Sequence, residues 1–225
     1  MHPLAFCHVL GLKIFCFHEN RFPIFRPFND PIDLKSIPHI VDDFIKLPNG
    51  SIVQSGTILQ RPLEKLPIEH QFLHHEGVVI GTTANKQQVI LEMNETQKRS
   101  GIHDVNFKGF MLHYSISDLV VRHTPETPIS PSLLLERAKK YRTTLYDVTK
   151  FNCQDLAHWL VFAERRSFFK EKQLERIDDL IAYFELMEKE TPSRELKPSL
   201  EKDLQSIKSR KAFLKKEIEL IKKYG

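Results

Sequence analysis

The hydrophobic and polar positions change their period along the chain, from short apolar runs to a helical repeat. In the middle third, residues 78–80 form a β-branched run that Gly81 closes, and residues 89–91 form a second run after the turn-like sequence TTANKQ. This pattern favours the two strands of a hairpin. Further strands are expected at residues 110–116 and 119–121.

Upstream of these strands, the apolar positions between residues 40 and 45 are spaced as in a short helix. Asn49-Gly50 then supplies turn residues that lead into another strand. Before residue 39, four prolines interrupt a Phe-rich stretch, which indicates an extended N-terminal arm.

From Ser132 onward the apolar positions follow the helical period. One helix is expected after the Ser-Pro pair, a second from Asn152, and two charged helices after Glu164, divided by Pro192 and Pro198. The pattern predicts an α+β domain with a small antiparallel sheet, followed by a helical hairpin. The expected division is an N-terminal arm (1–39), the α+β domain (40–165) and an amphipathic hairpin (166–225).

The net charge of +4 comes from the C-terminal end of the chain. Residues 205–225 hold seven basic and two acidic side chains, so the rest of the chain is close to neutral. Few aromatic residues lie among these lysines, which argues against nucleic-acid binding. The basic segment 208–223, from Lys208 to Lys223, could lie on an anionic membrane, but Glu217 and Glu219 interrupt it and favour helix packing or oligomerisation.

The apolar stretch 4–17 contains His8 and Lys13 and has no basic start, so it is not typical of a signal peptide. No run of about 20 apolar residues predicts a membrane span. The expected location is therefore the cytoplasm, with peripheral membrane contact left open. Three cysteines without a CxxC pair predict neither a disulfide scaffold nor a zinc site, and no cofactor is expected.

Cys153 is the candidate nucleophile. It follows Asn152, a favoured N-cap residue, and would lie in the first turn of a helix. Free backbone amides and the helix dipole there favour a thiolate and could also hold an oxyanion. The alternative is that Cys153 is a small buried hydrophobic residue at the start of a helix.

His75 is the candidate base. It precedes the strand run, and Gly77 lies two residues on, hence on the same face, where a small residue leaves room for a substrate. The alternative is a surface histidine or one with a structural hydrogen bond.

The order of these segments resembles the lecithin:retinol acyltransferase-like family, a circularly permuted branch of the NlpC-type papain-like superfamily. The resemblance spans residues 50–163 and rests on His75-Glu76-Gly77-Val78-Val79-Ile80-Gly81, on the ERAKK and LYDV segments, and on Asn152-Cys153-Gln154-Asp155. It implies a permuted papain-like fold in which Cys153 accepts the acyl group and His75 activates it.

Two positions depart from the family pattern. Gln154-Asp155 replaces the usual Glu-His after the cysteine, and the family's polar residue on the second hairpin strand falls on Leu91. Glu92 is the nearest polar substitute and the candidate third member, although using it requires a one-residue register shift. The alternatives are a solvated Glu92 with a Cys-His dyad, or an inactive relative.

The sequence thus predicts cysteine-dependent acyl transfer or hydrolysis through a thioester, on a lipid or other acyl substrate. A cysteine peptidase or amidase of the same superfamily is the first alternative. A non-catalytic interaction module is the second.

Overall fold

The structure is a computed structural model, and it describes residues 37, 39–63, 74–95, 100–147, 150–190 and 197–224. The N-terminal arm, with Cys7 and Cys16, lies almost entirely outside these residues. The described residues divide into two compact units, residues 37–171 with 218–224 and residues 172–217.

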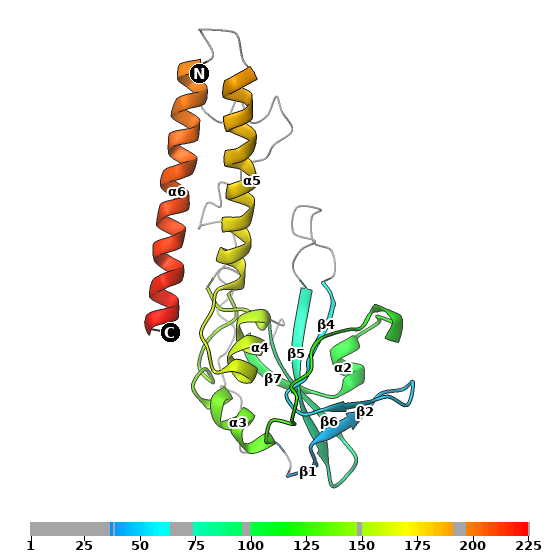
Figure 1. Ribbon diagram of the computed structural model, residues 1–225. Helices are drawn as coiled ribbons and strands as arrows, with labels where there is room; N and C mark the ends of the chain where they lie inside the picture. Colours follow the sequence, from blue (N-terminus) through cyan, green and yellow to red (C-terminus); the bar gives the residue numbers. More distant parts are fainter. Residues whose placement is uncertain are drawn as a thin grey trace. The chain divides into compact units, whose positions relative to one another are not determined.

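The elements follow one another along the chain as eight strands, five α-helices and one short 3-10 helix among the described residues (Figure 1). They are β1 (Ile40–Asp42), β2 (Phe44–Lys46), β3 (Ile52–Gln54), β4 (Ile58–Pro62), β5 (His74–Thr83), β6 (Gln88–Glu95), β7 (Ser100–Val105), α2 (Phe107–Met111), η2 (Ile116–Asp118), β8 (Val120–His123), α3 (Pro131–Lys139), α4 (Cys153–Phe162), α5 (Phe168–Glu190) and α6 (Lys197–Tyr224).

An antiparallel sheet in the order β7-β6-β5-β4-β8 forms the centre of the first unit, and β1 pairs with the end of β5. The fold class is therefore α+β, as the sequence predicts. Helices α3 and α4 cover one face of the sheet and α2 covers the other (Figure 1). The β5–β6 hairpin and the helices near Ser132 and Asn152 are confirmed.

Two local predictions are wrong. Residues 40–45 form parts of two strands, β1 and β2, because β1 pairs with the distant β5 and β2 forms a hairpin with β3. Residues 110–116 hold the end of α2 and the start of η2 instead of a strand. Asn106 caps α2 by accepting a hydrogen bond from the Gly109 amide, so a local signal sets this helix.

Hydrophobic residues on both sheet faces form separate cores. Val78, Ile80 and Leu91 point toward α3 and α4, whereas Val79 and Ile90 point toward α2. This alternation assigns His75 and Gly77 to the α2 face and Glu76 to the α4 face.

A β-bulge in β5 sets the register of the hairpin. Val79 lies opposite Ile90 and Gly81 opposite Val89, so Ile80 is an extra residue with no counterpart on β6. As a result Glu92 lies opposite Gly77 rather than opposite Val78. Because a one-residue shift exchanges the two faces of a strand, the bulge moves Glu92 onto the face of His75.

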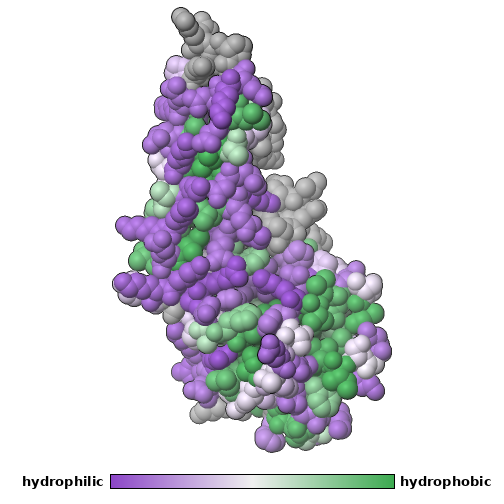
Figure 2. Space-filling model, viewed as in Figure 1, coloured by the Kyte–Doolittle hydropathy of each residue, from purple (hydrophilic) through white to green (hydrophobic). Residues whose placement is uncertain are grey.

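The second unit is the helical hairpin of α5 and α6. Buried Ile181, Phe184, Leu200 and Leu204 form its core, and Figure 2 shows hydrophobic residues as a strip between largely hydrophilic surfaces. Lys208 pairs with Glu185 at 2.8 Å and Lys211 with Asp178 at 2.5 Å. Among the described helices, none combines the length and the apolar character needed to cross a membrane.

We expect Gly81→Ala to destabilise the protein more than Gly50→Ala does. Gly81 has φ +144°, and a Cβ there would overlap the Asp42 carbonyl oxygen and lie 2.7 Å from Ile40 Cγ2. Gly50 has φ +86° but has open space around it, so it serves as the matched control. Urea unfolding should show losses of roughly 2–4 kcal/mol and about 1 kcal/mol, respectively. Equal losses would show that the bulge tolerates a side chain.

Candidate active site

Cys153 begins α4, and its environment follows from the helix cap. The Asn152 side chain accepts hydrogen bonds from the amides of Gln154 (2.9 Å) and Asp155 (3.2 Å), and the Asp155 carboxylate accepts the Asn152 amide in return. This capping box fixes the first turn. The thiol of Cys153 lies 3.6 Å from the carbonyl oxygen of His74, at the start of β5.

His75 and Glu92 lie side by side in the sheet. The Nε2 atom of His75 is 2.8 Å from Oε2 of Glu92. Only 1% of His75 and 4% of Glu92 is exposed, so the interpretation of Glu92 as a solvated strand residue is wrong. The β5 bulge is the physical reason, since it supplies the register shift that Glu92 requires.

Cys153 also interacts with the His75 ring. Burial alone would lower the pKa of His75, but the charge and hydrogen bond of Cys153, and then those of Glu92, outweigh burial. Together they raise the pKa from 6.5 to about 9. All three candidate residues therefore meet at one place in the fold. Cys153 is 2% exposed and also packs in the hydrophobic core. This agrees with the alternative that it is a small buried hydrophobic residue at the start of a helix.

Several residues near the site were not predicted from the sequence. Asn94 Nδ2 donates to Glu92 Oε1 at 3.3 Å, and His103 lies opposite Glu92 on β7. Asn94 lies one strand and His103 two strands away from His75. Only the correct register of β6 and β7 would have predicted that they lie near it. Phe110 packs against the His75 ring at 5.7 Å between centroids, and Arg61 donates to the Phe110 carbonyl at 2.5 Å.

Asp155 connects α4 to the chain that follows it. Its Oδ1 accepts a hydrogen bond of 2.7 Å from the Phe168 amide, at the start of α5, while Oδ2 accepts the Asn152 amide. Burial raises the pKa of Asp155 to about 7, although both amides act in the opposite direction.

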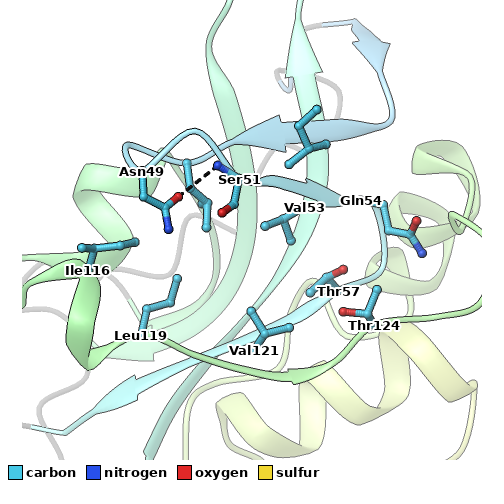
Figure 3. A pocket seen from close by; sticks show the side chains of 11 residues that line it. Asn49, Ser51, Val53, Gln54, Thr57, Ile116, Leu119, Val121 and Thr124 are labelled. Atoms are coloured by element: carbon cyan, nitrogen blue, oxygen red, sulfur yellow. Dashed lines mark hydrogen bonds between the residues drawn. The ribbon is translucent and has the colours of Figure 1, made fainter.

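A cavity of about 370 Å³ lies elsewhere in the same unit. Figure 3 shows it between the β2–β3 hairpin and β8, with Val53, Leu119 and Val121 on its walls. Cys153, His75 and Glu92 do not line this cavity. In the described part of the chain, no group of three or more His, Cys, Asp or Glu side chains could hold a metal ion.

Comparison with known proteins yields no relative: no protein-family model, curated protein or solved structure matches the chain. The interpretation of the site therefore rests on its geometry and on the resemblance of the motifs.

We expect Glu92→Gln to lower the pKa of His75 from about 9 toward its ordinary value by about one unit or more, because the variant removes a carboxylate hydrogen-bonded to the ring. NMR titration of the imidazole resonances measures this shift. The control is Asp104→Asn, which removes an exposed carboxylate on β7 opposite Leu91. An unchanged His75 titration in Glu92→Gln would show that the carboxylate does not act on the ring.

We expect Asp155 to make stability fall as pH rises from about 4 to about 7. The folded protein holds this proton up to a pKa of about 7, whereas the unfolded chain releases it near 3.8, so folding takes up a proton in this window. Chemical denaturation of the wild type should therefore lose more free energy across the window than that of Asp155→Asn. Asp179→Asn, an exposed change in α5, should behave like the wild type.

Proposed function

We propose that the protein is a cysteine-dependent acyltransferase or hydrolase with a permuted papain-like fold, acting through a thioester acyl-enzyme on a lipid or other acyl substrate. The observation that carries this proposal is the buried His75–Glu92 pair at 2.8 Å, with Cys153 acting on the same imidazole. The motif resemblance around Cys153 and His75 supports it.

His75 serves as the base and acid of this reaction. Its Nε2–H donates to Glu92, so the other ring nitrogen, Nδ1, is the one that exchanges a proton with Cys153. With a pKa of about 9 the ring is protonated at neutral pH, and an imidazolium beside the sulfur favours the thiolate. Glu92 holds the ring orientation and stabilises its positive charge.

The start of α4 offers a donor for the oxyanion. The Asn152 side chain accepts the amides of Gln154 and Asp155, and the Asn152 carbonyl accepts that of Leu156. Among the described residues, the Cys153 amide has no acceptor. It is therefore available to bind the negative oxygen of a tetrahedral intermediate.

The reaction proceeds in two halves. The thiolate attacks the ester or amide carbonyl carbon, and the leaving alcohol or amine takes the proton from His75 as its bond to the carbonyl breaks. His75, now neutral, removes a proton from water, an alcohol or an amine, which attacks the thioester. The thiolate leaves, and the acid or the new ester or amide is released.

A non-catalytic interaction module is the second candidate, and the burial of the site favours it. Cys153 and His75 are almost fully covered in the described structure, and the cavity of about 370 Å³ does not reach them. A peptidase or amidase remains the alternative within enzymes, because the same residues would attack a peptide carbonyl.

For partners, we propose that the C-terminal hairpin acts mainly in helix packing or homo-oligomerisation, with no role in binding nucleic acid. Within the basic segment 208–223, Lys208, Lys211 and Lys222 form ion pairs with acidic residues. Fewer basic groups are thus available to an anionic membrane, which leaves peripheral contact as a secondary proposal. A cytoplasmic location fits this picture.

We expect a p-nitrophenyl acyl ester to label Cys153 in the full chain, seen as a mass increase of one acyl group on the peptide that contains Cys153. His75→Gln should reduce the labelling rate by about 100-fold or more, since the variant removes the imidazolium beside the sulfur and the proton-transfer group of the reaction.

The control for this experiment is His113→Gln, which also replaces one histidine by glutamine but lies on the loop after α2. Labelling at Cys153 that is equally fast in wild type and His75→Gln would contradict the proposal. An absence of labelling with esters, together with labelling by a peptide-based thiol probe, would favour the amidase. Inertness to both would favour the interaction module.

A further inference from the structure

The cavity of about 370 Å³ has no part in the proposed reaction. Its walls come from the β2–β3 hairpin, the turn into β4, the η2 segment and β8 (Figure 3). The volume falls within the range of small-molecule sites in proteins. Since a water molecule takes about 30 Å³ in the liquid, the cavity has room for a chain of about ten carbon-sized atoms.

Thr57 places a buried hydroxyl without a partner at the wall of this cavity. The residue is 0% exposed and precedes β4. Its backbone is paired, since its amide donates to the Gln54 carbonyl at 3.2 Å and its carbonyl accepts the Val79 amide at 3.0 Å. Its Oγ1 has no hydrogen-bond partner in the described structure, whereas the neighbouring Ser55 hydroxyl donates to the Val79 carbonyl at 3.5 Å. An unpaired buried hydroxyl is costly, so this atom is suited to a ligand.

Two further polar side chains lie at the same end of the cavity as Thr57. Gln54 ends β3, and its Nε2 donates to the carbonyl of Pro125, the residue after Thr124. Figure 3 shows Gln54, Thr57 and Thr124 near one another on the cavity wall. This end therefore offers hydroxyl and amide groups to the polar part of a ligand.

The rest of the cavity is mainly apolar. Figure 3 shows Val53 and Val121 in its middle, with Leu119 and Ile116 toward the opposite end. Val121 is 48% exposed and Ile116 is 39% exposed, so these walls present hydrophobic surface to the solvent. Because covering such surface is favourable, this part of the cavity is suited to an alkyl chain.

The cavity wall carries no charged side chain, as none of its eleven lining residues is Asp, Glu, Lys, Arg or His. The remaining polar residues, Asn49 and Ser51, belong to the β2–β3 turn, where Asn49 Oδ1 accepts the Ser51 amide at 3.1 Å. An ionised ligand would lose water here without gaining a counter-charge. The wall thus favours a neutral ligand.

We propose that this cavity binds a neutral amphiphile, such as a fatty alcohol with about eight carbons. Its polar head forms a hydrogen bond with Thr57 Oγ1, and its alkyl chain lies along Val121 and Leu119. The inference does not depend on the proposed reaction, because none of the three candidate catalytic residues lines the cavity.

The test is a titration of the full chain with octan-1-ol, followed by NMR of the methyl groups. We expect the methyl resonances of Val53, Leu119 and Val121 to shift in a saturable way. Those of Val161, in the core on α4, should stay in place. Octanoate has an alkyl chain of similar length but carries a carboxylate, and it should bind about tenfold more weakly or worse.

Thr57→Val removes the hydroxyl and preserves the shape of the side chain. We expect it to weaken octan-1-ol binding about three- to tenfold, the effect of one hydrogen bond. Without octan-1-ol, the variant should resist urea as well as the wild type or better, because it removes an unpaired buried hydroxyl. Thr143→Val, at an exposed threonine outside the cavity, is the matched control and should bind octan-1-ol like the wild type.

Val121→Phe is a second variant that fills the cavity. Because Val121 is 48% exposed, the larger ring can be accommodated without disturbing the core, and the fold is checked by circular dichroism. The saturable shifts of Val53 and Leu119 should disappear in this variant.

Four results would overturn the proposal. They are a wild type without saturable shifts, equal binding of octan-1-ol by Thr57→Val, equal binding of octanoate, and unchanged binding by Val121→Phe. A Thr57→Val variant less stable than the wild type would also contradict it, because the hydroxyl would then have a structural partner. None of these results bears on acylation of Cys153, so the proposed function stands or falls separately.

Discussion

The extra residue in β5 is the constraint on which the rest of the site depends. It lets Gly81 lie opposite Val89 while Val79 lies opposite Ile90, so the strand changes face once within the hairpin. Glycine is required because β1 passes against this point, with the Asp42 carbonyl where a side chain would be. The bulge therefore allows both cores to remain apolar while Glu92 joins His75.

Burial makes the charged groups of this site depend on one another. His75, Glu92, Glu76 and Asp155 each lie in a low-dielectric interior, where an unpaired charge would be costly. Each is matched by a neighbour: Glu92 and Cys153 for His75, Arg122 for Glu76, and two backbone amides for Asp155. Both faces of β5 thus carry paired polar groups, His75 with Glu92 on one face and Glu76 with Arg122 on the other.

The features that could be predicted from the sequence are those that local residues determine. Asn152 caps α4 by accepting the amides of Gln154 and Asp155, so local residues place Cys153 in the first turn of the helix. The pairing of Glu92 with His75 does not follow from local residues. It depends on a bulge in β5 that packs against β1, about 40 residues earlier in the chain. The same long-range pairing makes residues 40–42 a strand despite their helical spacing, and a hairpin with β3 does so for β2.

The departures from the family motif also acquire a physical explanation. Gln154 stands where the family has Glu, and here it faces the buried Glu76, which a second carboxylate would repel. Asp155 stands where the family has His, and it caps α4 and binds the Phe168 amide. A glutamate at residue 92 replaces the polar residue expected at residue 91 because the bulge exchanges the faces of β5 relative to β6. The departures at residues 155 and 92 are therefore each matched by a hydrogen bond in this fold, Asp155 with the Phe168 amide and Glu92 with the His75 ring.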